Sequence, residues 1–137
     1  MFKVLIVDDA KLMRNIIKNT ILENFKNVNV IEAKDGMEAI DIYRSEKPDL
    51  VTMDITMEQK NGVDSAKEIY KINKKAKIVM VTSLGQEKIL QECLKMGVSD
   101  YIVKPFTKER IVTMLSNSLN VRRSKESRQI QLDERNS

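Results

Sequence analysis

Short apolar runs alternate along the chain with stretches that have helical periodicity. The apolar runs occupy residues 4–7, 28–31, 50–53, 78–81 and 101–103, and the second of them is weaker and alternating. Continuous runs of this length that are rich in β-branched residues are typical of strands buried on both faces, as in a parallel sheet. We therefore expect five strands.

A stretch with helical spacing follows each run. In the first stretch we expect one apolar face made of Leu12, Met13, Ile16, Ile17, Ile21 and Phe25. The later stretches cover 36–46, 63–73, 89–96 and 107–119, with Gly97 as a stop signal and Thr107 as an N-cap. Five strands that alternate with five helices predict an α/β fold, in which helices cover both faces of a parallel sheet.

Composition narrows the chemistry that is open to this chain. Its 137 residues fit one domain, and they include one cysteine and no histidine. This excludes an internal disulfide framework, a cysteine zinc cluster, Ser-His-Asp hydrolysis and phosphohistidine chemistry on this chain. Any reaction must therefore use carboxylates, hydroxyls, lysine and a bound cation.

Charge and hydropathy indicate a soluble protein without a membrane span or a nucleic-acid surface. The sequence is 42% hydrophobic and 32% charged, and it holds no apolar run of the roughly 18 residues that a membrane span needs. The net charge of +4 is shared between residues 1–120 and 121–137 and forms no basic stripe. We expect a cytoplasmic protein with a domain at 1–120 and a charged extension at 121–137, helical or disordered.

Polar side chains follow four of the five predicted strands. Asp8 and Asp9 follow the first, Asp54 ends the third, Thr82-Ser83 ends the fourth and Lys104-Pro105 ends the fifth. Each alone has an ordinary explanation: Thr82-Ser83, for example, would cap the next helix. Together they predict one crevice, because ligands bind at the carboxyl ends of strands in open α/β sheets.

The residue types in this crevice suit phosphoryl chemistry. Three crowded carboxylates resist ionising together, and a divalent cation with hard oxygen ligands, Mg²⁺ above all, relieves their repulsion. Lys104 and Thr82 would add an ammonium and a hydroxyl around a phosphoryl group. In the absence of histidine, the nucleophile would be an aspartate, and its attack on phosphorus gives an acyl phosphate.

Four sequence motifs carry a resemblance to a known family. They are VDD at 7–9, MDITM at 53–57 with Gly62 eight residues after Asp54, VTS at 81–83 and YIVKPF at 101–106. Over about residues 2–120 the chain resembles the receiver domain of two-component response regulators, most closely the stand-alone chemotaxis regulators of the CheY type. The resemblance implies a doubly wound, flavodoxin-like five-stranded parallel sheet in the order 2-1-3-4-5 with five helices.

The resemblance also implies a metal site and a phosphoacceptor. Asp54 would accept the phosphoryl group, and Asp9 would bind Mg²⁺ directly, with Asp8 nearby or bound through water. The backbone carbonyl of Thr56 would be a further ligand of the metal. One departure is visible in this loop: Glu58 stands where the family usually has proline.

Further residues would bind the phosphoryl group and relay its presence. By resemblance, Thr82, beside Ser83, would hydrogen-bond the phosphoryl oxygen, and Lys104 would pair with it. Tyr101 would turn inward as Thr82 moves. The bond before Pro105 is where the family has a cis peptide.

The implied protein is a signalling phosphoacceptor rather than a classical enzyme, with Mg²⁺-dependent phosphotransfer and autodephosphorylation. Its expected partners are a sensor histidine kinase, a phosphatase and a flagellar switch protein or other output protein, and its expected state is a monomer or weak dimer. Two alternatives stay open: a single-domain receiver of a phosphorelay or sporulation pathway, and the receiver part of a transcriptional regulator. A haloacid-dehalogenase-type phosphatase is disfavoured by Thr56, where a second aspartate would stand. A nucleotide-binding module is disfavoured by Asp8-Asp9 in place of a glycine-rich loop.

Overall fold

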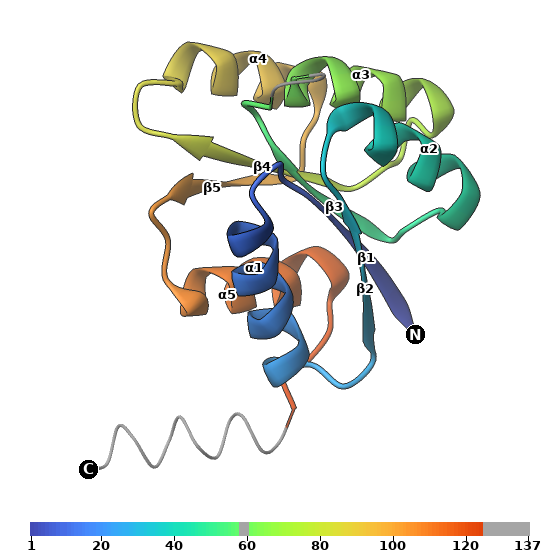
Figure 1. The fold of residues 1–137 in the computed structure, drawn as a ribbon, viewed down its shortest axis with the longest axis vertical. Coiled ribbons are helices and arrows are strands. Elements are labelled where there is room, and N and C mark those ends of the chain that lie inside the picture. The colour runs from blue at the N-terminus through green and yellow to red at the C-terminus, as the bar shows by residue number, and fades with distance from the viewer. Residues whose placement is uncertain (58–60, 125–137) are drawn as a thin grey trace.

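The computed structural model describes residues 1–57 and 61–124 and shows a single parallel sheet with helices on both faces (Figure 1). The sheet has five strands in the order β2-β1-β3-β4-β5, and all four neighbouring pairs are parallel. The elements in chain order are β1 (Phe2–Val7), α1 (Lys11–Asn24), β2 (Val28–Ala33), α2 (Gly36–Glu46), β3 (Leu50–Asp54), α3 (Gly62–Ile72), β4 (Ile78–Ser83), α4 (Glu87–Met96), β5 (Asp100–Lys104) and α5 (Lys108–Leu119). The predicted fold class and strand order are confirmed.

Two apolar layers hold the helices on the sheet. Helices α1 and α5 pack on one face, with Ile17, Ile21, Ile111 and Leu115 in their layer, whereas α2, α3 and α4 cover the other face (Figure 1). The central strand β3 is buried at every position, as a strand covered on both faces must be. No helix among the described residues is long and apolar enough to span a membrane.

The apolar face predicted for the first helix is partly wrong. Ile17 and Ile21 are buried, but Leu12 is 73% exposed and Ile16 is 38% exposed. Residues on an α-helix are 100° apart, so Leu12 lies about half a turn away from Ile21 and faces away from the sheet. When a helix carries apolar residues on every side, its sequence does not indicate which side packs against the sheet.

Helix ends follow the predicted signals at α4 and α5. The Thr107 side chain accepts a hydrogen bond from the Arg110 backbone N–H, and Gly97 ends α4 in the left-handed region at φ 104°. The ordinary explanation of Thr82-Ser83, a cap for the fourth helix, does not hold. The residue before α4 is Gln86, because Leu84 and Gly85 form a turn between β4 and the helix.

The segment that follows α5 returns to the end of α1. Residues 121–124 form neither helix nor strand. Arg123 Nε donates to Asn24 Oδ1 at 2.7 Å, and the Ser124 N–H donates to the Asn24 carbonyl at 2.8 Å. Glu58 and the extension beyond residue 124 lie outside the described residues, and the domain boundary near residue 120 stays a prediction.

Candidate functional site

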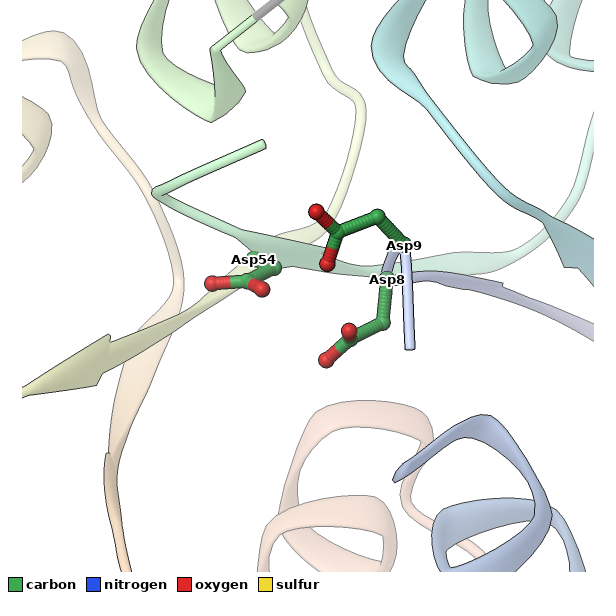
Figure 2. Close-up of side chains that lie close together, drawn as sticks. All are labelled: Asp8, Asp9 and Asp54. Carbon is green, nitrogen blue, oxygen red and sulfur yellow. The ribbon is translucent and has the colours of Figure 1, made fainter. Parts of the chain in front are cut away.

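Three carboxylates meet at the carboxyl end of the sheet (Figure 2). Asp8 and Asp9 directly follow β1, and Asp54 is the last residue of β3, the strand that pairs with β1. Each offers one oxygen, and these oxygens lie within 4.8 Å of one another. Asp8 and Asp54 are buried, whereas Asp9 is exposed. The structure thus brings together the three acids that were predicted to share a crevice.

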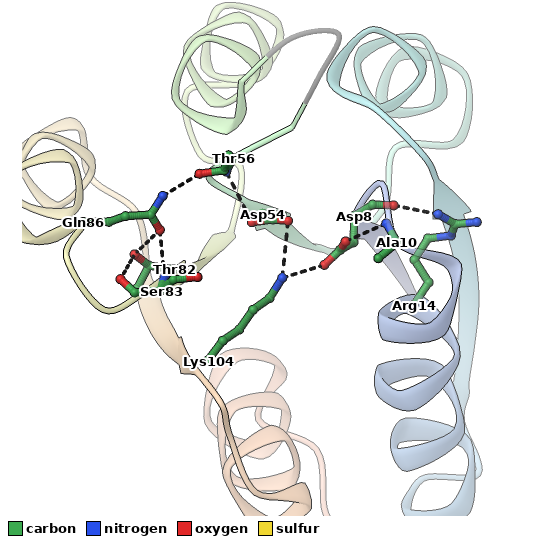
Figure 3. Close-up of polar contacts among 9 residues, drawn as sticks. All are labelled: Asp8, Ala10, Arg14, Asp54, Thr56, Thr82, Ser83, Gln86 and Lys104. Atoms are coloured by element: carbon green, nitrogen blue, oxygen red, sulfur yellow. Dashed lines mark hydrogen bonds and ion pairs between the residues drawn. The ribbon is translucent and has the colours of Figure 1, made fainter.

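Lys104 neutralises part of this acidic cluster (Figure 3). It ends β5, two strands away from β3, and its long side chain reaches back along the edge of the sheet. Its Nζ lies 3.1 Å from Asp8 Oδ2 and 3.4 Å from Asp54 Oδ2. The ammonium therefore bridges the two buried carboxylates. An added cation or a phosphoryl group would compete with it for this position.

Burial and neighbouring charges shift the pKa values of Asp54 and Lys104. Burial and the nearby Asp8 carboxylate raise the pKa of Asp54 to about 6, although Lys104 and the Thr56 N–H partly offset them. Burial opposes the charge of Lys104, but Asp54 and Asp8 outweigh it and raise the pKa of its ammonium. The ionised form of Asp54 is therefore disfavoured in the folded protein, and a cation bound at the site would make it more favourable.

The raised pKa of Asp54 predicts that the stability of the protein depends on pH when no Mg²⁺ is added. The folded pKa of Asp54, about 6, lies above the unfolded value of 3.8, so the folded state binds more protons in between. The free energy of unfolding should therefore fall between about pH 4 and pH 6, by roughly 3 kcal/mol from this group, and then level off. Urea unfolding of native protein and Asp54→Asn across pH 4–8 measures the difference. A difference that stays constant with pH would contradict the assignment.

The turn after β1 is fixed by Arg14. Asp8 Oδ1 accepts the Ala10 N–H at 2.9 Å, and Arg14 Nη1 donates to the Asp8 carbonyl at 2.7 Å (Figure 3). Arg14 Nε also donates to Glu32 Oε1 at 3.2 Å, which ties the end of β1 to the end of β2. The sequence analysis missed this residue, because an arginine six positions after Asp8 carries no recognisable spacing signal.

Thr82 and Ser83 lie at the end of β4, where Gln86 binds both. Gln86 Oε1 accepts from Thr82 Oγ1 at 3.0 Å and from the Ser83 N–H at 2.7 Å, and its amide nitrogen donates to Thr56 Oγ1 (Figure 3). Thr82 itself is 3% exposed. Gln86 is a second residue that sequence reasoning missed, although the pattern Ser-x-x-Gln at 83–86 resembles a capping box and could have drawn attention to it.

The remaining predicted residues frame the site. The Lys104–Pro105 peptide bond is cis. Tyr101 on β5 is 38% exposed, beside a hollow of about 410 Å³ that Asp100, Val103, Phe106 and Arg110 also line. Gly62 begins α3, and its N–H donates to the Ile55 carbonyl at 2.8 Å, just beyond Asp54.

The carboxylate cluster fits Mg²⁺. Its donors are the hard oxygens that Mg²⁺ prefers, and one oxygen of each residue lies within 4.8 Å of the other two. Asp54 and Asp8 are buried next to each other with one lysine between them, so that a divalent cation would relieve the repulsion that raises the pKa of Asp54. Asp8, Asp9 and Asp54 are thus the residues that would hold it.

Comparison with known proteins gives concordant matches. The profile of the family described as "Response regulator receiver domain" matches residues 4–116. Chemotaxis protein CheY of Bacillus subtilis (strain 168) is 41% identical over 118 residues, which cover 86% of this chain and 98% of that protein. Chemotaxis protein CheY of Thermotoga maritima is 46% identical over 114 residues, which cover 83% and 94%.

Solved structures agree with the sequence matches. A chain in the crystal structure of the CheX-CheY-BeF3-Mg+2 complex from Borrelia burgdorferi has a TM-score of 0.79 at 31% identity, with 88% of this chain and 90% of that one covered. The response regulator domain of Thermotoga maritima CheB has a TM-score of 0.76 at 33% identity, with 88% and 95% covered.

Proposed function

Because the chain belongs to the response regulator receiver family, we propose that it accepts a phosphoryl group on Asp54 from a sensor histidine kinase and passes the signal to an output protein of chemotaxis. The observation that carries this proposal is the arrangement of Asp54, Asp8, Asp9 and Lys104. The buried Asp54 carboxylate, the proposed nucleophile, belongs to the cluster of three carboxylates and contacts the Lys104 ammonium, which supports the proposal. The two CheY proteins are matched over nearly their whole length, which supports an output in chemotaxis.

In the proposed transfer, one Asp54 oxygen attacks phosphorus, and the bond between phosphorus and the histidine nitrogen of the kinase breaks. The nitrogen keeps the electron pair, and because the other ring nitrogen of the phosphohistidine carries a proton, the kinase histidine leaves as neutral imidazole while Asp54 becomes an acyl phosphate. Mg²⁺ bound by the three carboxylates would offset the charge of the incoming phosphoryl group. Lys104 would exchange its contact with Asp54 for one with a phosphoryl oxygen, and its pairing with Asp8 keeps it beside that position.

The proposed output surface is the face formed by α4, β5 and α5. Leu94 on α4 and Tyr101 on β5 are large apolar or aromatic side chains that remain 46% and 38% exposed. The hollow beside Tyr101 gives this face a depression next to the end of β5, the strand that carries Lys104. In the proposal, phosphorylation draws Thr82 toward Asp54, Tyr101 turns inward, and the populations of two pre-existing states shift. A 100-fold shift requires about 2.7 kcal/mol.

A pull-down tests the output. The full chain is immobilised with Mg²⁺, with or without the phosphoryl mimic beryllofluoride, and exposed to lysate; the Asp54→Asn variant is the matched control. We expect a flagellar switch protein to be recovered from the native chain only with the mimic. Recovery of a phosphotransfer protein instead would favour the phosphorelay alternative. Equal recovery with and without the mimic would contradict signalling through Asp54.

A further inference from the structure

One side-chain amide joins two loops of the site. Gln86 Oε1 accepts hydrogen bonds from Thr82 Oγ1 and from the Ser83 N–H, while its Nε2 donates to Thr56 Oγ1 (Figure 3). Thr56 comes two residues after Asp54, and its N–H donates to Asp54 Oδ1 at 3.3 Å. A chain of hydrogen bonds therefore runs from the end of β4, through Gln86, to the loop that carries the candidate phosphoacceptor.

The bridge determines where the Thr82 hydroxyl points. A threonine hydroxyl has one proton to donate, and here its acceptors are Gln86 Oε1 at 3.0 Å and the Ser83 carbonyl at 3.3 Å. Ser83 is the last residue of β4 and Gln86 directly precedes α4, so both acceptors lie on the side of Thr82 that leads to α4. The proton is thus directed toward that segment, although Thr82 lies one residue beyond Val81, which pairs with Asp54 across the sheet.

The backbone holds Gln86 in place for this task. Gly85 has φ +93°, and the Gln86 N–H donates to the Ser83 carbonyl at 3.3 Å, so residues 83–86 form a tight turn with glycine at the position that needs positive φ. The Gln86 carbonyl then accepts the Leu90 N–H at 2.9 Å, which anchors Gln86 to the first turn of α4. A primary amide is required, because the same group both accepts and donates.

We propose that Gln86 is a positioning residue that holds Thr82 away from Asp54 in the resting state, so that phosphoryl uptake must break the bridge from Thr56 through Gln86 to Thr82. The inference rests on the proposed phosphoacceptor function and extends it to the control of the switch. Removing the amide eliminates a contact that exists only in the resting state and therefore favours the state in which Thr82 is free to bind the phosphoryl group.

The expected effect is tighter binding of a phosphoryl mimic. In the native protein, Thr82 must give up its hydrogen bond to Gln86 before it can bind the mimic. Without this one bond, Gln86→Ala should bind beryllofluoride with Mg²⁺ about 2- to 10-fold more tightly than the native protein. Isothermal titration calorimetry measures this affinity. Gln91→Ala, the same change at an exposed position of α4, is the matched control and should bind as the native protein does.

The sign of the change distinguishes positioning from structural support. If Gln86 only braced the turn, its removal would leave the affinity unchanged or weaken it, and either result would overturn the inference. If the native protein itself failed to bind the mimic, the proposed function would fail first.

A second measurement uses the native chain and so does not depend on how the variant folds. The side-chain amide resonances of Gln86 in a ¹H-¹⁵N spectrum should shift on addition of beryllofluoride with Mg²⁺, because the Thr82 proton leaves its acceptor. Resonances of Gln86 that stay in place while those of the Asp54 loop move would also overturn the inference.

Discussion

Asp54→Asn should abolish the incorporation of acid-labile phosphate from acetyl phosphate in the presence of Mg²⁺. The amide keeps the size of the carboxylate but has no anionic oxygen to attack phosphorus, and no histidine in the chain can take its place. We expect a loss of roughly 100-fold or more in labelling, down to the background of the assay. Radiolabelled acetyl phosphate, followed by acid precipitation and gel separation, measures it.

The matched control for this experiment is Asp41→Asn. Asp41 lies on α2 with its side chain 80% exposed, and the same change there removes one negative charge far from the carboxylate cluster. It should label as the native protein does. Labelling that persisted in Asp54→Asn would place the phosphoacceptor elsewhere and remove the basis of the proposed function.

Gly62→Ala should disrupt both the stability of the protein and the position of Asp54. A Cβ built on Gly62 would lie 2.1 Å from the Asp54 carbonyl oxygen and 2.9 Å from the Ile55 Cα, which are backbone atoms that cannot rotate away. The end of β3 or the start of α3 must therefore move. We expect a loss of about 2–4 kcal/mol in the free energy of unfolding, measured by urea denaturation, together with weaker Mg²⁺ binding.

Gly97→Ala separates this steric effect from the general cost of replacing a glycine. Gly97 has φ +104°, but no atom lies within 4 Å of the position that its Cβ would take. It should lose only about 1–2 kcal/mol, from backbone strain, and keep native Mg²⁺ binding, because α4 ends far from the carboxylates. If the Gly62 and Gly97 variants lost the same stability and bound Mg²⁺ equally, the close packing of α3 against β3 would not govern the site.

The parts of the fold that were predictable are those where burial leaves one choice. Residues 50–53, which are apolar apart from Thr52, are typical of a strand covered on both faces, and they lie in the central strand β3. The first helix was less predictable because its sequence is apolar on several sides. Leu12 and Ile16 satisfy helical spacing as well as Ile17 and Ile21 do, and only the position of the sheet selects between them.

The residues of the site also differ in how well they could be predicted from the sequence. Asp8, Asp54 and Lys104 could be placed together because each ends or directly follows a parallel strand, and these ends meet at one edge whatever the side chains do. Arg14 and Gln86 act through side chains that reach back from helix α1 and from the turn before α4. The contacts of Arg14 depend on turn geometry and rotamers, for which residue spacing gives no rule, whereas the Ser-x-x-Gln spacing at 83–86 indicates only the bond from Gln86 to the Ser83 N–H and not those to Thr82 and Thr56.

The hydrogen bonds between residues 121–124 and Asn24 fix a point on the molecule at which a label can be attached. Asn24 ends α1 just before β2 starts, so its partner Ser124 lies where the strands begin, at the opposite end of the sheet from the carboxylates. A dye or a surface tether attached at residue 124 would therefore join the molecule on the side away from the proposed phosphoryl chemistry. Immobilised in this way, the protein would present its carboxylate edge to the surrounding solution.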